Sequence, residues 1–394
     1  MPLGPRVPPN LFAIALGIAG LALAWQTAAA LLGTARLAPD VLEILDAALW
    51  LVLVGLYLLQ GPRIIMADLR DPVLSPFVSA SVLTAMLLSA ALASASFAAG
   101  RVLVIVFLAV TIGLGGWLTG QWMTGGIDQD SLHPGYFLPT AAGGLIGANV
   151  ATQVHLHALA EASFGIGIIS WVVLGSVTLN RLFTRPALPP ALVPTLAIEL
   201  GIPAVAGTAY FAVAGRTVSL AACVLGGYAI LMALVQVRLI PVYRRLSFAA
   251  GFWSFTFSYA AAGADALAWL AIKRPAGTTG YAIAIIALLT AFVAWIAFRT
   301  ALLAARGQLF PPRGRLFHRC APGRARLTTG PGMRSWRGLR PCQPPTTAAA
   351  RQAAAPRPRA YRGLAMSDSA PMIGEPIGVV PTRAIDHSAV IRPR

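Results

Sequence analysis

One carboxylate in an apolar stretch is the first candidate for chemistry in this chain. Glu199 lies seven residues into a segment, 192–213, that is long and apolar enough to cross a membrane. A carboxylate within a bilayer is costly and indicates function by default. Two interpretations stay open. Glu199 faces a neighbouring helix as a neutral or hydrogen-bonded group, or it titrates and couples transport to protons.

Two polar groups near the connections between apolar segments invite a catalytic or metal interpretation: His155, His157 and Glu161 at the hairpin between the fifth and sixth spans, and Asp128, Asp130 and His133. In a helix, residues two positions apart point about 200° apart, so His155 and His157 cannot share one face. We therefore expect a solvated loop there and no metal site. A polytopic membrane enzyme would need these groups together, and we expect them on opposite sides of the membrane. No Ser-His-Asp set or nucleotide-binding loop is present in the sequence, so we predict no enzyme and no cofactor.

Three further carboxylates lie toward the ends of apolar segments. Glu43 and Asp46 begin one such segment, and Asp265 lies near the end of another that finishes with Lys273 and Arg274. We expect all three carboxylates at the membrane interface, with Asp265 paired to the adjacent basic residues.

The elements that position these residues are membrane-spanning helices. The mean hydropathy is +0.73, and only 11% of residues are charged, against about a quarter in soluble domains. A span needs roughly 20 apolar residues. Ten stretches meet this length, so we predict an all-α integral membrane protein with five helical hairpins. The predicted spans are 10–31, 41–60, 76–98, 101–119, 136–157, 160–181, 192–213, 218–238, 249–271 and 280–302.

The net charge of +17 is concentrated after the last span. Residues 1–305, the predicted transmembrane domain, hold 14 basic and 10 acidic side chains, whereas residues 306–394 hold 16 basic and 3 acidic ones. The second segment is rich in Pro, Gly and Arg without apolar periodicity, which predicts a disordered tail. It either attracts anionic lipid or is an extension without function. Its few aromatic residues do not favour nucleic-acid binding.

The distribution of basic residues between loops predicts the orientation, because cytoplasmic loops are enriched in Lys and Arg. We predict a multi-pass protein of the inner (cytoplasmic) membrane. With both termini in the cytoplasm, eight basic residues lie in inner loops and five in outer loops. The outer five are Arg36, Arg101, Arg216, Lys273 and Arg274.

Proline and glycine interrupt the odd-numbered spans more than the even-numbered ones. Pro139 and Pro203 lie inside predicted spans, and a broken helix is tolerated in lipid only beside protein or a water-filled cavity. We therefore expect the five odd-numbered helices to form an inner ring around a pore. General enrichment of Gly, Ala and Pro in membrane helices is the alternative explanation.

Three motifs carry a family resemblance: FWSFTF in the ninth span, YFLPT in the fifth and PTL…PAVA in the seventh. Over residues 8–302 the chain resembles the tellurite-resistance/dicarboxylate transporter family, which includes plant guard-cell slow anion channels. The resemblance implies a homotrimer with one pore in each protomer and a phenylalanine gate, which corresponds to Phe257. Plant relatives carry proline directly after this residue, where this chain has Ser258. Further candidates for pore-lining or helix-break positions are Phe12, Phe77, Phe137, Pro139 and Pro203.

The resulting expectation is a channel or transporter for small anions: halide, nitrate, an oxyanion or a dicarboxylate. An apolar constriction gates by steric block and dewetting, and helix N-termini exposed at Pro139 and Pro203 would favour anions. The alternative within transport is a proton-coupled carrier or exporter of dicarboxylate, sulfite or oxyanion that uses Glu199. A membrane enzyme is the remote alternative.

Overall fold

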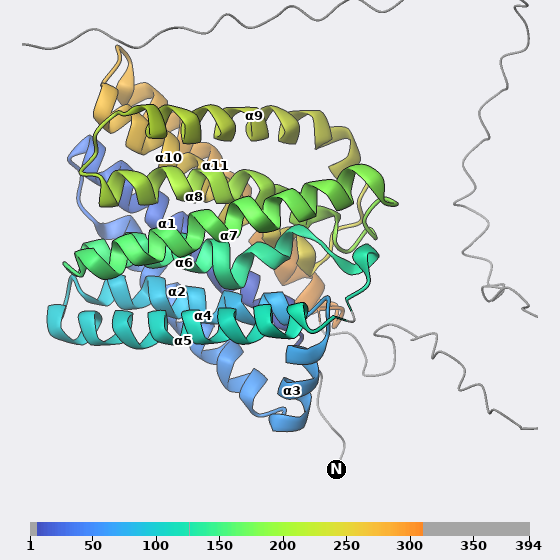
Figure 1. The fold of residues 1–394 in the computed structure, drawn as a ribbon. Coiled ribbons are helices and arrows are strands. Elements are labelled where there is room, and N and C mark those ends of the chain that lie inside the picture. Colours follow the sequence, from blue (N-terminus) through green and yellow to red (C-terminus); the bar gives the residue numbers. More distant parts are fainter. Residues whose placement is uncertain (1–5, 126, 310–394) are drawn as a thin grey trace, which may run out of the picture. The chain divides into compact units, whose positions relative to one another are not determined.

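A computed structural model describes residues 6–125 and 127–309, all within one unit of the chain, Met1–Cys320. The predicted tail lies almost wholly outside the described residues. The regular structure of the described part is helical, and Figure 1 shows its long helices running roughly parallel. The α-helices are α1 (Phe12–Leu32), α2 (Leu37–Leu58), α3 (Pro62–Arg70), α4 (Ser75–Leu92), α5 (Phe97–Met123), α6 (Gly143–Gln153), α7 (His157–Thr184), α8 (Ile198–Val213), α9 (Leu220–Tyr243), α10 (Trp253–Lys273) and α11 (Thr278–Ala305).

Nine helices of the described residues are long and apolar enough to cross a membrane. The predicted fifth span, 136–157, is not one of them, because its backbone changes geometry twice. It begins as the 3-10 helix η3 (Pro134–Phe137), continues as the π-helix η4 (Leu138–Ala142) and ends as α6, which has 11 residues. Pro139 lies inside the π-helical segment and lacks the N–H that a regular α-helix needs there.

The long helices fall into a buried and an exposed set. In the most apolar part of α1, α4, α8 and α10, 50% to 72% of residues are buried. The corresponding share in α2, α5, α7, α9 and α11 is 17% to 22%. Most of α6 is also buried. The buried helices contact one another in a closed cycle that runs from α1 through α10, α8, α6 and α4 back to α1.

The irregular backbone lies at the beginnings of the buried helices. Short 3-10 helices lead into α1, α8 and α10: η1 (Pro9–Leu11), η5 (Val193–Ala197) and η6 (Ala250–Phe252). Proline occupies a first-turn position of η1, η3, η5 and α4, where its missing N–H costs little. None of the five exposed long helices begins with such a segment in the described chain.

The structure corrects the predicted break at Pro203. This residue lies inside α8, which continues through it from Ile198 to Val213. Proline removes one backbone hydrogen bond, yet α8, which packs against α9 and α10, continues past it. The irregular part of this span is η5, around Pro194.

Two elements between the spans were not predicted. The short helix α3 follows α2, and its Asp68 accepts hydrogen bonds from Arg6 and from the Tyr57 hydroxyl. These contacts join the start of the described chain to the end of α2. The second element is the 3-10 turn η2 (Gln129–Ser131), whose first turn is capped by the Asp128 side chain.

A buried histidine joins the loop before α4 to the start of η3. The Nε2 of His133 lies 3.2 Å from the Val73 carbonyl, and its Nδ1 accepts a hydrogen bond from the Gly135 N–H. These partners fix the neutral tautomer protonated at Nε2. Burial, assisted by the Arg181 charge, lowers the pKa of His133 to about 4 against the opposing effect of the Val73 carbonyl.

This pKa predicts a loss of stability in acid. Because the folded-state pKa lies below the unfolded value of 6.5, the contribution is complete above pH 6.5 and is lost as the pH falls toward 4. The full loss is about 3 kcal/mol. Melting temperatures measured in detergent from pH 7.5 to 4 check this. The variant His133→Gln should show a flatter pH dependence than the natural chain, and equal slopes would contradict the prediction.

Candidate functional site

Three cavities follow one another along the five buried helices. The largest, which we call the vestibule, has a volume of about 680 Å³. Next come two much smaller spaces, the near cavity of about 20 Å³ and the far cavity of about 30 Å³. The polar side chains that line the vestibule are Gln26, Thr27, Arg36, Asn149, Thr152, Gln153, Thr208, Arg216 and Arg274.

The lining residues advance along each helix in the same order. On α10, Ser254 lines the far cavity, Ala261 the near cavity and Ala268 the vestibule. On α8 the corresponding residues are Ile202, Val205 and Ala212. The same order holds for α1, α4 and η4–α6: the earlier residues of each segment line the far cavity and the later ones line the near cavity. The cavities therefore define a path along the axis of the buried helices.

Phe257 separates the two small cavities. It is the one residue that lines both the near and the far cavity. Its position depends on the close approach of α1 and α10: a Cβ atom on Gly20 would lie 2.9 Å from the Phe257 ring. Glycine at this position thus leaves room for the Phe257 ring between α1 and α10.

Among the other aromatic residues of this segment, Trp253 also lines the far cavity, whereas three others pack away from it. Phe252, Phe255 and Tyr259 form ring contacts with one another or with Phe292 of α11. Phe257 forms no aromatic pair with any residue of the described chain. Its surroundings are therefore those of a cavity-lining residue and differ from those of the neighbouring aromatic cluster.

The remaining predicted pore or break residues have different environments. Phe77 lines the far cavity. Phe12 lies edge-on against Tyr57 of α2, with ring centroids 5.2 Å apart. Phe137 is fully buried and lies toward Gly175 of α7. The Pro139 carbonyl lies against Gly115 of α5, and Pro203 lines none of the three cavities.

Glu199 is buried beside the path. It is 5% exposed, and its Oε1 has no hydrogen-bond partner in the described chain. Its neighbours Ile198 and Ile202 line the far cavity, but Glu199 does not. It lies close enough to Tyr228 of α9 for the two groups to interact electrostatically. The carboxyl group therefore faces the contact between α8 and α9.

Two of the carboxylates predicted at the interface are buried within the protein, and the predicted pairing of Asp265 is wrong. Asp265 lies directly against Gly207 of α8 and pairs with neither Lys273 nor Arg274 in the described chain. Asp46 is fully buried, and neither of its carboxylate oxygens has a hydrogen-bond partner among the described residues. Both helices extend further past these carboxylates than predicted.

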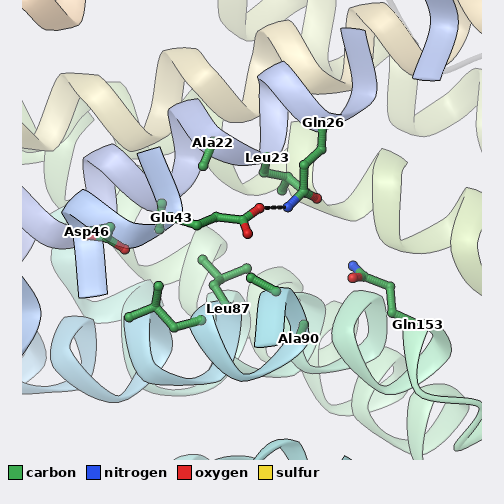
Figure 2. Close-up of a pocket in the computed structure, with 11 residues that line it drawn as sticks. Ala22, Leu23, Gln26, Glu43, Asp46, Leu87, Ala90 and Gln153 are labelled. Atoms are coloured by element: carbon green, nitrogen blue, oxygen red, sulfur yellow. Dashed lines mark hydrogen bonds between the residues drawn. The ribbon is translucent and has the colours of Figure 1, made fainter. Parts of the chain in front are cut away.

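Asp46 lines a small side cavity of about 20 Å³ between α1, α2 and α4 (Figure 2). In this view the Glu43 carboxylate points toward Gln26 of α1, which donates a hydrogen bond to it. Gln153 of α6 lies on the other side of the space. Since Gln26 and Gln153 also line the vestibule, the side cavity adjoins the wide end of the path.

The two polar groups considered for enzyme chemistry lie apart, and the loop expected around His157 and Glu161 is wrong, because both residues lie in the first turns of α7. His155 occupies the turn between α6 and α7, and His157 begins α7, with the two ring centroids 6.3 Å apart. Asp130 lies before η3, within 4.0 Å of Arg185 at the opposite end of α7. These residues are therefore at opposite ends of the helices.

Sequence reasoning missed the arginines of the vestibule as a group. Arg36, Arg216 and Arg274 come from three loops and line one cavity. The expected topology placed all three on the outer side of the membrane, and this was the one indication in the sequence that they could lie close together. Their convergence depends on the packing of α1, α8 and α10.

Comparison with known proteins places the chain among membrane channels and transporters. The family model described as SLAC1, voltage-dependent anion channel, matches residues 6–301. A tellurite resistance protein TehA homolog from Haemophilus influenzae is 28% identical over 273 residues, which cover 67% of this chain and 81% of the relative. The matched region contains all the buried helices that line the path.

Proposed function

Because the chain belongs to the SLAC1 family of voltage-dependent anion channels, we propose that it conducts small anions passively through the path described above. The observation that carries this proposal is the position of Phe257, which alone lines both small cavities. In the proposal its ring is the gate: it blocks the path sterically and keeps water out of an apolar constriction.

The proposed pore has ten spans arranged as five hairpins. The segment η3–η4–α6 would be the fifth of these ten spans, and the inner ring would consist of α1, α4, η4–α6, α8 and α10. The closed cycle of contacts among these helices supports the ring. We place the protein in the inner membrane with both termini in the cytoplasm and the vestibule on the outer side. We also propose a homotrimer with one pore per protomer. Mass measurement in detergent tests the trimer.

Helix dipoles supply the electropositive field at the inner end of the proposed pore. All five inner helices run in the same direction, so their N-termini gather at the far-cavity side. A helix N-terminus carries roughly half a positive charge. This field attracts anions without a charged side chain in the narrow part of the path.

Flux measurements in proteoliposomes test this function. Purified protein is reconstituted, and a halide, nitrate, an oxyanion and a dicarboxylate are tested with an imposed membrane potential and no pH gradient. We expect anion flux that follows the potential. Flux that requires a proton gradient would support the proton-coupled carrier instead.

The substitution Glu199→Gln distinguishes the channel from that carrier. Glu199 lies beside the path and does not line its cavities, so the variant is expected to retain the passive conductance of the natural chain. The measurement compares potential-driven and pH-driven uptake for both proteins. Loss of pH-driven uptake in the variant would contradict passive conduction and assign Glu199 a coupling role.

A further inference from the structure

Three arginines surround the wide end of the path. Arg36 follows α1, Arg216 follows α8 and Arg274 follows α10, and all three line the vestibule. The lining contains no aspartate or glutamate. The vestibule is therefore a strongly basic cavity of about 680 Å³.

These three arginines differ in their partners. Arg36 lies 3.3 Å from Asp40 and 3.5 Å from Glu43, so two carboxylates balance its charge. Arg216 and Arg274 form no ion pair within the described chain. Two uncompensated guanidinium groups thus remain at the mouth of the path.

The backbone at these two positions is unusual for arginine. Arg216 has a φ of 60° and Arg274 a φ of 44°, and only one other non-glycine residue of the described chain, His155, has a positive φ. Glycine and asparagine adopt this left-handed conformation more readily than residues with long side chains. Helix termination alone would therefore favour another residue, which points to a use for the side chains.

Helix dipoles make basic residues necessary at this end. The inner helices terminate here, and each C-terminus carries roughly half a negative charge. Without compensation, these ends would repel an anion that approaches the vestibule. Arginine can also stabilise a helix C-terminus, but that role does not require its side chain to line a cavity.

We propose that Arg216 and Arg274 form an anion-capture site that favours carboxylates and oxyanions over halides. A guanidinium group presents paired N–H donors that match two oxygens of one anion, whereas a halide cannot use this geometry. Further hydrogen-bond donors lie between these arginines and Phe257: the side chains of Asn149, Gln153 and Thr208 line both the vestibule and the near cavity. This inference rests on the proposed conduction of anions.

The double variant Arg216→Asn with Arg274→Asn tests the capture site. Asparagine removes the charge and suits a positive φ, so the melting temperature should not fall. Flux of nitrate and acetate at low ionic strength should fall about fivefold or more, because charge-steered association depends strongly on such fields. The reduction should shrink at high salt. Arg101→Asn is the control, since Arg101 begins α5 at the same end and lines none of the three cavities.

Flux is measured in a Phe257→Ala background, so that the gate does not limit it. A double variant that behaves like Arg101→Asn would overturn the capture site while conduction itself persists. Absence of all anion flux in this background would instead overturn the proposed function. Replacing both arginines with lysine should retain chloride flux and reduce the preference for nitrate and acetate. An unchanged preference would overturn the selectivity.

Discussion

Replacing Phe257 with alanine is expected to raise the anion conductance by about tenfold or more, because an apolar constriction controls conduction by steric block and dewetting. The substitution removes the ring that separates the near and far cavities. The two small spaces then join the vestibule in one continuous path. Current recordings in planar bilayers, made with equal amounts of natural and variant protein, measure the increase.

The matched control is Phe255→Ala on the same helix. Phe255 packs against Tyr243, Phe252 and Phe292 and lines none of the cavities of the path. Its loss should lower the melting temperature without a comparable rise in conductance. Equal conductance of the natural chain and Phe257→Ala would contradict the assignment of Phe257 as the gate.

Replacing Gly144 with valine is expected to destabilise the fold by about 3 kcal/mol, the upper end of the usual cost of overpacking. A Cβ atom at this position would lie 2.5 Å from the Gly167 nitrogen and 2.6 Å from the Ser163 carbonyl oxygen of α7. Both contacts are with backbone atoms, which cannot move aside like a flexible side chain. Small residues permit such close helix packing in membranes. Yield of folded protein and melting temperature in detergent measure the effect.

Gly165→Val provides the comparison. Gly165 also lies on α7, but a Cβ atom there would meet no other atom within 4 Å. This variant should therefore retain nearly the natural melting temperature. Equal stability of the two valine variants would contradict the close backbone contact between α6 and α7 at Gly144.

Much of the architecture could be predicted from apolar length and from the placement of proline. Nine predicted spans correspond to long helices, and the predicted family was confirmed. The alternation between spans is reflected in burial, since the helices with Pro and Gly near their beginnings are the more buried set. Proline at an N-terminal turn also leads to the 3-10 segments η1, η3 and η5.

The depth and direction of individual side chains could not be predicted in the same way. In a membrane helix both the lipid-facing and protein-facing sides are apolar, so hydropathy gives little information about rotation. This is why the burial of Asp46 within the protein was not predicted. Pro203 illustrates a related limit, because α8 is continuous there although proline cannot donate a backbone hydrogen bond.

Cysteine accessibility tests the central claim most directly. Single cysteines replace Thr208 in the vestibule, Ser254 in the far cavity or Val224 on the exposed face of α9, in a chain whose natural cysteines are serine. A negatively charged methanethiosulfonate reagent is added from the vestibule side. We predict rapid modification at position 208, none at 224, and modification at 254 only when Phe257 is also alanine. Modification at 254 at the same rate with and without the Phe257 ring would contradict a path closed by that residue.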